Sequence, residues 1–325
     1  MFRKSISFVL LIVMLFSLVS CGSSGETEPE QDTPKVFHIG ICQLLQHPAL
    51  DLATEGFIAA LTDKLDGRVA FDLKNASGEP ANCTTIVNGF VTDEVDLIMA
   101  NATPALGAAA AATLTIPILG TSITEYGAAL DISDFSGSSG RNISGTSDLA
   151  PLDQQAQMIA DLFPDAKNIG ILFCSTEANS KYQVKVVSQC LNDMGLNVKE
   201  FSFTDTNDIA AVTQQACDES DVLYIPTDNK AADCAETINN VAVVAGVPII
   251  AGEEGICKAC GVATLTISYF DIGYETGLMA FEILENGADI SKMEIRYAPE
   301  FTKKFNPTLA EKYGLTFSDD YEAIE

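Results

Sequence analysis

Two helix starts and two acidic residues in this sequence have the chemistry to bind a small zwitterion. Thr103-Pro104 and Ser175-Thr176 each stand where a polar loop leads into a helix, and Pro suits the first helical position. Helix N-termini carry unpaired N–H groups and a partial positive charge, so they bind carboxylates without a cationic side chain. The loops around them contain no Arg, and Asp228 and Glu254 are the acids available to an ammonium group. These residue types favour a ligand that carries both a carboxylate and an ammonium.

The segments that carry these residues occur twice in the same order. Each copy holds an apolar strand with polar residues after it, then a strand that leads into an Ala-rich helix, then a strand that opens on an apolar residue and Pro. The matching segments are 36–41 with 168–173, 96–104 with 221–229, and 116–122 with 247–254. An internal repeat of this kind indicates two similar structural units.

Strands that alternate with helices predict a parallel sheet with helices on both faces, here in each of two α/β lobes. Ligands of such sheets bind beyond the carboxyl ends of the strands, where the polar residues of each repeat gather. Two lobes with facing polar edges predict a binding cleft between them.

The last part of the chain predicts how the lobes are joined. A helix expected at 271–285 has no counterpart in the second repeat, so we expect it to return to the first lobe. Chain crossings near 144–149, 266–269 and 296–299 would then form a three-stranded hinge. The expected boundaries are 36–147 plus 269–296 for the N-terminal lobe and 148–268 plus 297–325 for the C-terminal lobe.

The N-terminal segment has the features of an export signal and a tether. Arg3 and Lys4 precede an apolar run at 6–19 that is shorter than the ~20 residues of a membrane span, so residues 1–20 are expected to be a signal peptide. The residues Leu-Val-Ser-Cys that end at Cys21 resemble the bacterial lipobox, which implies a lipid on Cys21. The rest of 21–35 has no large apolar side chain and predicts a flexible tether. We therefore expect an extracytoplasmic protein, lipid-anchored to the bacterial cell membrane.

Composition narrows the function classes. The formal charge of −27 argues against nucleic acid, whose recognition needs a basic surface, and the lipid bilayer is expected to be met through the anchor only. Eight cysteines besides Cys21 would permit disulfides in an exported protein. Most of them stand inside apolar strand or helix patterns, however, which favours free, buried thiols. We expect a monomer without cofactor or metal.

The segments GICQLLQHPALD, NATPA, CSTEANS, YIPTDN, AGEEG and SYFDIGYETG, in this order, resemble the substrate-binding proteins of ABC transporters with the type I periplasmic-binding fold. The resemblance covers about Val36 to Tyr297, and within the family it looks like the subgroup associated with aromatic amino acids such as tryptophan. It implies two Rossmann-like lobes on a three-stranded hinge and a small-molecule ligand that is passed to an ABC permease. Cys174, Cys257 and Cys260 depart from the family pattern.

The resemblance also implies, loop by loop, which residues contact the ligand. They are Gln43, Gln46, His47, Thr103 and Ser122 in the first lobe, Ser175, Asn179, Ser180, Thr227, Asp228, Asn229 and Glu254 in the second, and Ser268 and Tyr269 at the hinge. Each Ser, Thr, Asp or Asn before a helix also has a simpler interpretation as a helix cap, and His47 fits capping or packing equally well. The convergence of six loops on one cleft favours binding for the set. Tyr126, Tyr182, Tyr269 and Phe270 are available for an apolar wall.

Two other function classes stay open. An enzyme is disfavoured because the sequence has no Walker A loop, no G-x-S-x-G and no G-x-G-x-x-G, and its only histidines are His38 and His47. The sharper enzyme hypothesis is a thiol-redox role for the single CxxC of Cys257 and Cys260, which requires one exposed thiol of low pKa. The second alternative is a sensory lipoprotein that binds the same ligand and reports to a membrane receptor.

Overall fold

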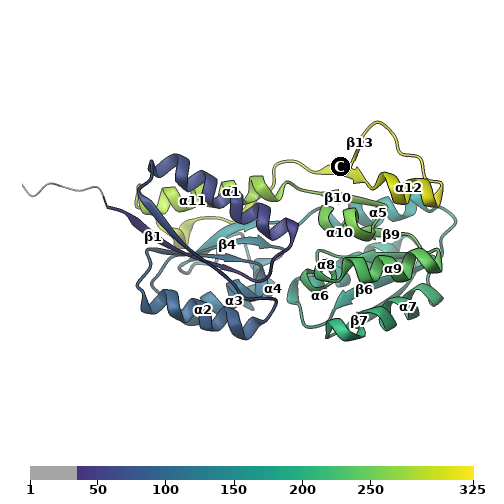
Figure 1. The fold of residues 1–325 in the computed structure, drawn as a ribbon, viewed down its shortest axis with the longest axis horizontal. Helices are drawn as coiled ribbons and strands as arrows, with labels where there is room; N and C mark the ends of the chain where they lie inside the picture. Colours follow the sequence, from purple (N-terminus) through teal and green to yellow (C-terminus); the bar gives the residue numbers. More distant parts are fainter. Residues whose placement is uncertain (1–34) are drawn as a thin grey trace, which may run out of the picture. The chain divides into compact units, whose positions relative to one another are not determined.

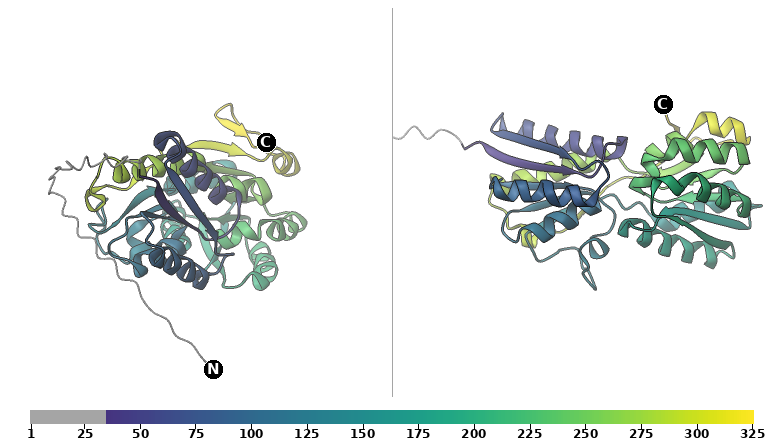
Figure 2. Two further views of the ribbon diagram at one scale, coloured as in Figure 1. Left: turned by 60° about the vertical axis from the view of Figure 1, so that its left-hand side comes forward. Right: turned by 60° about the horizontal axis from the view of Figure 1, so that its bottom comes forward.

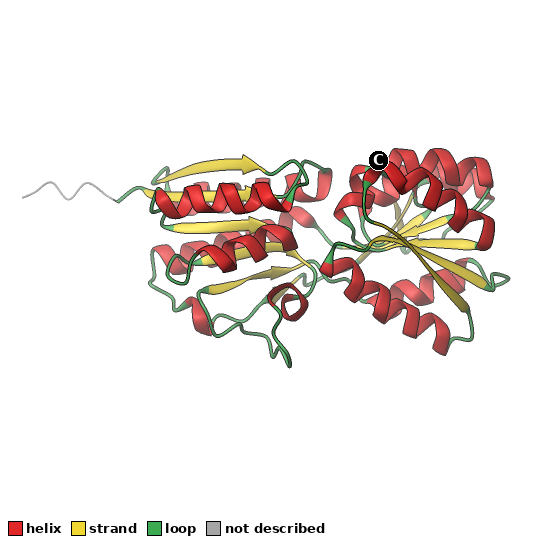
Figure 3. Ribbon diagram, turned by 90° about the horizontal axis from the view of Figure 1, so that it is seen from below, coloured by secondary structure: helices red, strands yellow, loops and turns green. Residues whose placement is uncertain are grey.

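Two separate sheets, each covered by helices on both faces, organise the chain (Figures 1 and 3). The computed structural model describes residues 35–325. The expected signal peptide, Cys21 and all of the tether except Lys35 lie outside the described residues. The predicted fold class, two α/β lobes with mainly parallel sheets, is confirmed.

The first sheet has six strands, all parallel, in the order β2-β1-β3-β4-β5-β11. Its strands are β1 (Phe37–Gln43), β2 (Val69–Asn75), β3 (Leu97–Asn101), β4 (Ile118–Ile123), β5 (Ile143–Ser147) and β11 (Arg296–Tyr297). Its helices are α1 (Pro48–Leu65), α2 (Pro80–Thr92), α3 (Thr103–Ala112), α4 (Tyr126–Leu130), α11 (Tyr269–Leu284) and the 3-10 turn η2 (Ile290–Lys292). The central strands β3 and β4 are buried throughout, as expected for parallel strands covered by helices on both faces. We call this sheet with its helices the first lobe.

The second sheet has seven strands in the order β7-β6-β8-β9-β10-β12-β13, parallel except for the β10–β12 pair. Its strands are β6 (Asn168–Cys174), β7 (Asn197–Phe203), β8 (Val222–Ile225), β9 (Ile249–Ala251), β10 (Ala263–Thr266), β12 (Thr302–Phe305) and β13 (Tyr321–Ala323). Its helices are α5 (Leu152–Leu162), α6 (Ala178–Asp193), η1 (Thr206–Asp208), α7 (Ile209–Glu219), α8 (Asn229–Asp233), α9 (Ala235–Ala245), α10 (Glu254–Cys260) and α12 (Pro307–Tyr313). We call this sheet with its helices the second lobe.

The end of the chain adds structure that the sequence pattern did not predict. Beyond Tyr297, where only a tail was expected, β12 and β13 extend the edge of the second sheet and α12 packs beside them. Both strands are short and at most half-buried. They therefore lack the apolar alternation by which a strand is recognised in a sequence.

Three connections join the lobes, after β5, after β10 and after β11. The second of them leads into α11, which packs along α1 and against β4 and β5 of the first lobe. The two helices lie side by side in Figures 1 and 2. Glycines make this packing unusually close: a Cβ on Gly273 would lie 2.0 Å from the carbonyl oxygen of Ala53, and one on Gly56 would lie 2.1 Å from that of Phe270.

The α1–α11 contact gives a stability prediction. We expect Gly273→Ala to destabilise the protein by about 1–3 kcal/mol, because the added methyl collides with backbone that cannot move aside as a side chain would. Gly89→Ala in α2 is the matched control: open space surrounds it, and replacing a helical Gly by Ala should stabilise by up to ~1 kcal/mol. Equilibrium urea unfolding of both variants measures the difference. Equal midpoints would show that the close approach is not needed.

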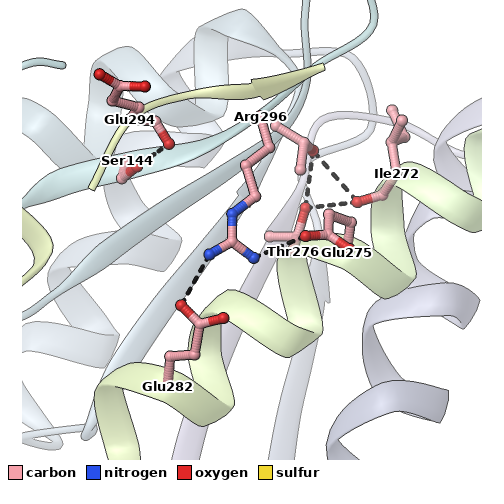
Figure 4. Close-up of polar contacts among 8 residues, drawn as sticks. Ser144, Ile272, Glu275, Thr276, Glu282, Glu294 and Arg296 are labelled. Atoms are coloured by element: carbon pink, nitrogen blue, oxygen red, sulfur yellow. Dashed lines mark hydrogen bonds and ion pairs between the residues drawn. The ribbon is translucent and has the colours of Figure 1, made fainter. Parts of the chain in front are cut away.

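Arg296 fastens the third connection to α11 (Figure 4). Its guanidinium Nη1 lies 2.7 Å from Glu275 Oε1 and its Nη2 lies 2.8 Å from Glu282 Oε2. The short strand β11 pairs with β5 at this point, and the hydroxyls of Thr146 and Thr276 lie 2.8 Å apart. Because all three charged side chains are partly exposed, we expect their ion pairs to contribute little free energy. Their role is to fix where the connection leaves the first lobe.

Candidate functional site

The carboxyl ends of β3, β4 and β5, which are neighbours in the first sheet, meet at one edge. Thr103 begins the helix after β3, Ser122 is the second-last residue of β4, and Asp148 follows β5 directly. The N–H of Ala102 donates to Thr121 O at 3.1 Å and ties the first two strand ends together. Three polar side chains from three strands are therefore brought to the same edge.

Two residues at this edge hold backbone conformations that L-amino acids rarely adopt. Ala102 has φ +87° and Ser122 has φ +55°, and the pairing of β4 with β5 shifts register between Gly120 and Ile123. Such conformations cost free energy and cluster at functional sites. At this edge α3 starts without a side-chain cap. The buried Ser122 Oγ also has no hydrogen-bond partner within residues 35–325, so polar groups there are left available.

Asp148 is a buried carboxylate with one unused oxygen. Its side chain is 4% exposed; Oδ2 accepts from the hydroxyl of Tyr269 at 3.1 Å, whereas Oδ1 has no partner among the described residues. None of the ion pairs of residues 35–325 includes it. Burial raises the pKa of Asp148 to about 6, although the hydrogen bond from Tyr269 favours the charged form. A buried carboxylate without a cation is a site for a positively charged ligand group.

The second lobe adds to the negative potential at this place. Glu253 is 3% exposed and uses both oxygens to cap α10, accepting from the N–H groups of Gly255 and Ile256. Burial raises the pKa of Glu253 to about 7, and the charge of Asp148 contributes to the rise. Tyr269, whose hydroxyl donates to Asp148, and Glu253 both line the same hollow.

The two acids expected to meet an ammonium group are otherwise engaged. Asp228 is the N-cap of α8: Oδ1 accepts from Ala231 N, and Oδ2 accepts from Cys174 N and Ser180 Oγ at 2.7 Å each. Glu254 forms an ion pair with Lys304 at 2.7 Å on a partly exposed surface. The structure therefore favours Asp148 over both as the partner of a ligand cation.

Several predicted site residues hold the loops in place. Gln43 donates to Leu45 O and Asp51 Oδ1 and accepts from Thr54 Oγ1, so its amide is fully used. Ser175 donates to Phe203 O, and Ser268 caps α11 by accepting from Asp271 N.

The remaining second-lobe residues surround Glu177, which the sequence analysis missed. The buried Glu177 carboxylate accepts from Asn229 N and Nδ2, from Lys230 N and from Asn179 Nδ2. Asn229 Oδ1 then lies 3.4 Å from His47 Nε2 of the first lobe. Burial lowers the pKa of His47. Asn179 Oδ1 is buried and has no partner within residues 35–325.

A hollow of about 1130 Å³ lies between the start of α1, the helices α8 to α10 and the segment 266–270. Of the predicted site residues, Gln46, His47, Glu254, Ser268 and Tyr269 line it. Its apolar lining includes two side chains that are large and exposed, Leu52 at 43% and Phe270 at 38%. The hollow thus has room for an aromatic group. It extends to Tyr269, whose hydroxyl contacts Asp148.

Two of the four aromatic residues considered for an apolar wall lie elsewhere. Tyr126 is buried in the core of the first lobe, where its hydroxyl donates to Gly120 O and Thr146 O. Tyr182 lies beside Glu125 and the loop 131–135, in a different and smaller depression.

All eight cysteines of the described residues are free, as predicted, and most are buried. Cys257 and Cys260 are 0% and 3% exposed, and burial raises the pKa of both thiols. A catalytic pair needs one exposed thiol of low pKa, and neither Cys257 nor Cys260 meets this requirement. Residues 35–325 also contain no group of three or more His, Cys, Asp or Glu placed to hold a metal.

Asp148 and Glu253 are buried acids of this candidate site that were not among the predicted residues, although Glu253 is adjacent to the predicted Glu254. Asp148 stands at the end of a strand in a predicted chain crossing, and it follows the polar run Ser144 to Ser147. An acid that directly follows a strand at a hinge is the signal that would have found Asp148.

Within residues 35–325, no helix is long and apolar enough to span a bilayer.

Comparison with known proteins agrees with this architecture. The family model described as ABC transporter substrate binding protein matches residues 38–323. A tyrosine-binding protein of Clostridioides difficile (strain R20291) is 35% identical over 292 residues, which cover 87% of this chain and 84% of the relative.

Solved structures give the same result. An ABC domain from Streptococcus pneumoniae in complex with L-Trp is 29% identical, with a TM-score of 0.83 over 87% of this chain and 96% of that one. The ligand-free, open structure of a C. difficile substrate-binding protein with adhesive properties is 32% identical, with a TM-score of 0.69 over 89% and 99%. The chain belongs to the substrate-binding proteins of ABC transporters, extracytoplasmic proteins that bind a small molecule and deliver it to a permease.

Proposed function

We propose that this chain is the lipid-anchored binding protein of an ABC importer and that it binds an aromatic α-amino acid between its lobes. The observation that carries the proposal is Asp148. Its Oδ1 is buried and unpaired within residues 35–325, and Glu253 is a second buried acid in its neighbourhood. An α-ammonium group would supply the missing hydrogen bonds and the missing positive charge.

The first-lobe edge suits the α-carboxylate. The N-terminus of α3 has no side-chain cap, and Ser122 Oγ has no partner among the described residues. Helix N–H groups and a hydroxyl can together hold an anion without a basic residue. A zwitterion would therefore find an acidic partner at Asp148, directly after β5, and a donor-rich partner at the neighbouring ends of β3 and β4.

The aromatic side chain is supported by two observations. The hollow beside Tyr269 has an apolar lining that includes Leu52 and Phe270, and relatives include a tyrosine-binding protein and a structure in complex with L-Trp. Micromolar binding needs ~8 kcal/mol in total. For a ligand with about 13 heavy atoms, such as tyrosine, this is roughly 0.6 kcal/mol per heavy atom, below the ceiling of ~1.5 kcal/mol per heavy atom.

The proposal includes the lobes and the anchor as expected from the sequence. The lobes are placed at 36–147 plus 269–296 and at 148–268 plus 297–325, and Cys21 carries the lipid.

Replacing Cys21 by Ser should release the protein from membranes. A Ser variant that stays membrane-bound would contradict the anchor and leave the ligand proposal intact.

Mass spectrometry of small molecules released from denatured protein identifies the bound ligand without any candidate being chosen in advance. We expect an aromatic amino acid, and isothermal titration should then give binding of tyrosine or tryptophan in preference to leucine. Tight binding of a sugar or a nucleoside would keep the transport role and overturn the ligand class.

A further inference from the structure

One hydrogen bond connects the two lobes away from the hinge. Among the side-chain hydrogen bonds of residues 35–325, only that between His47 and Asn229 joins an element of the first lobe to an element of the second outside the connecting segments. His47 is the residue before α1 and is not used as a side-chain cap for that helix. Its ring is therefore free to reach across.

The orientation of Asn229 is fixed by its own lobe. Asn229 Nδ2 donates to Glu177 Oε2 at 2.7 Å, and the backbone N–H groups of Asn229 and Lys230 donate to the two oxygens of the same carboxylate. Because Glu177 takes the amide NH₂ group, the amide oxygen has to point toward His47. Only a ring with a proton on Nε2 can then complete the contact, since Asn229 Oδ1 is an acceptor.

We propose that Glu177, Asn229 and His47 form a latch that holds the lobes together over the ligand, with Glu177 as the positioning residue. The inference rests on the proposed function in one respect: the latch stabilises the arrangement in which the amino acid is enclosed. A direct bond of this kind contributes to the closed arrangement alone, because its donor and acceptor lie on different lobes. Its loss should therefore weaken binding without disturbing either lobe.

A double-mutant cycle tests the latch in the full-length protein, with the binding of tyrosine and tryptophan measured by calorimetry. His47→Ala and Asn229→Ala should each weaken binding by about 3–10-fold. The double variant should be no weaker than either single one, because both remove the same bond. His47→Gln should retain near wild-type affinity, since an amide NH₂ group can replace the Nε2–H donor. Asn192→Ala, which changes an exposed residue of α6 outside the hollow, is the control and should bind as wild type.

Glu177 is tested on the same scale. Glu177→Gln should weaken binding, and adding Asn229→Ala to it should cause no further loss, because the amide is then no longer held in place. Additive effects of His47→Ala and Asn229→Ala, or unchanged affinity in both, would overturn the latch while the wild-type protein still binds the amino acid.

A second measurement separates this inference from the proposed function. If the wild-type protein binds no amino acid, the proposed function fails, and small-angle X-ray scattering of the free proteins decides the latch alone. The two Ala variants and their double should then share a larger radius of gyration than wild type and His47→Gln. Equal radii for all proteins would overturn the latch.

Discussion

Asp148→Asn should weaken the binding of an aromatic amino acid by at least ~30-fold, because one partner of a desolvated charge pair is removed. Asn has the same shape and can still accept from the Tyr269 hydroxyl, which lies 3.1 Å from Asp148 Oδ2. Only the negative charge offered to the ammonium group is lost. Isothermal titration of tyrosine and tryptophan against both proteins measures the effect.

The same substitution should not reduce stability. The folded-state pKa of Asp148 is raised above its ordinary value to about 6, so its contribution to folding is fully present only below the ordinary pKa and is lost as the pH rises through 6. At pH 7.5 the buried charge opposes folding, and Asn removes it. We therefore expect the melting temperature of Asp148→Asn to equal or exceed that of the wild type.

Glu254→Gln is the matched control for Asp148→Asn. Its ion pair with Lys304 is partly exposed and should contribute at most ~1 kcal/mol, so binding should stay within a few-fold of wild type. A larger loss of affinity in Glu254→Gln than in Asp148→Asn would assign the ammonium site to Glu254 instead.

Ligand affinity should fall in acid, and the midpoint should lie near pH 6. The ammonium group needs an ionised Asp148, and burial raises the pKa of this carboxyl to about 6. Above pH 7 the acid is ionised in the free protein and affinity should be flat; below pH 6 affinity should drop by up to ~10-fold per pH unit. At pH 6 binding should release about half a proton, which calorimetry in buffers of different ionisation enthalpy detects.

Titration of His47 and of Glu253 would also change ligand affinity with pH, so their effects have to be distinguished from that of Asp148. Burial lowers the pKa of His47, so protonation of this ring in acid would also oppose closure. Burial raises the pKa of Glu253 to about 7. The pH profile is therefore compared between His47→Gln and the double variant with Asp148→Asn. Affinity in His47→Gln that is constant from pH 8 to pH 5 would contradict the assignment of Asp148.

The fold was predictable because the internal repeat displays the same order of strands and helices twice. Apolar strands followed by polar loops recur in both halves of the chain, and this pattern depends on local periodicity that a sequence displays. The strands β12 and β13 were not predicted because both are short and at most half-buried, and therefore show no apolar alternation. What the sequence predicts well is thus the set of buried strands and the edge at which they end.

The individual site residues were less predictable, because a polar residue at a strand end can bind a ligand or its own backbone. Asp228 follows β8 as a ligand-binding acid would, yet it caps α8 and anchors Cys174 N. Asp148 lies at an equivalent strand end and keeps one oxygen free. Asp228 is the third residue after β8 and Asp148 the first after β5, so both acids stand where a strand ends. Only the three-dimensional path of the following residues decides whether backbone N–H groups turn back to meet the carboxylate.

The central claim, that an α-amino acid with an aromatic side chain binds between the lobes, is tested most directly by tryptophan fluorescence. The chain contains no Trp, so all indole emission comes from the ligand. On addition of protein we expect the emission of tryptophan to shift to the blue and to saturate. N-acetyltryptophan and tryptophan amide should each bind at least ~30-fold more weakly, since each lacks one charged group. An unshifted spectrum, together with tight calorimetric binding of a sugar or a nucleoside, would contradict the account.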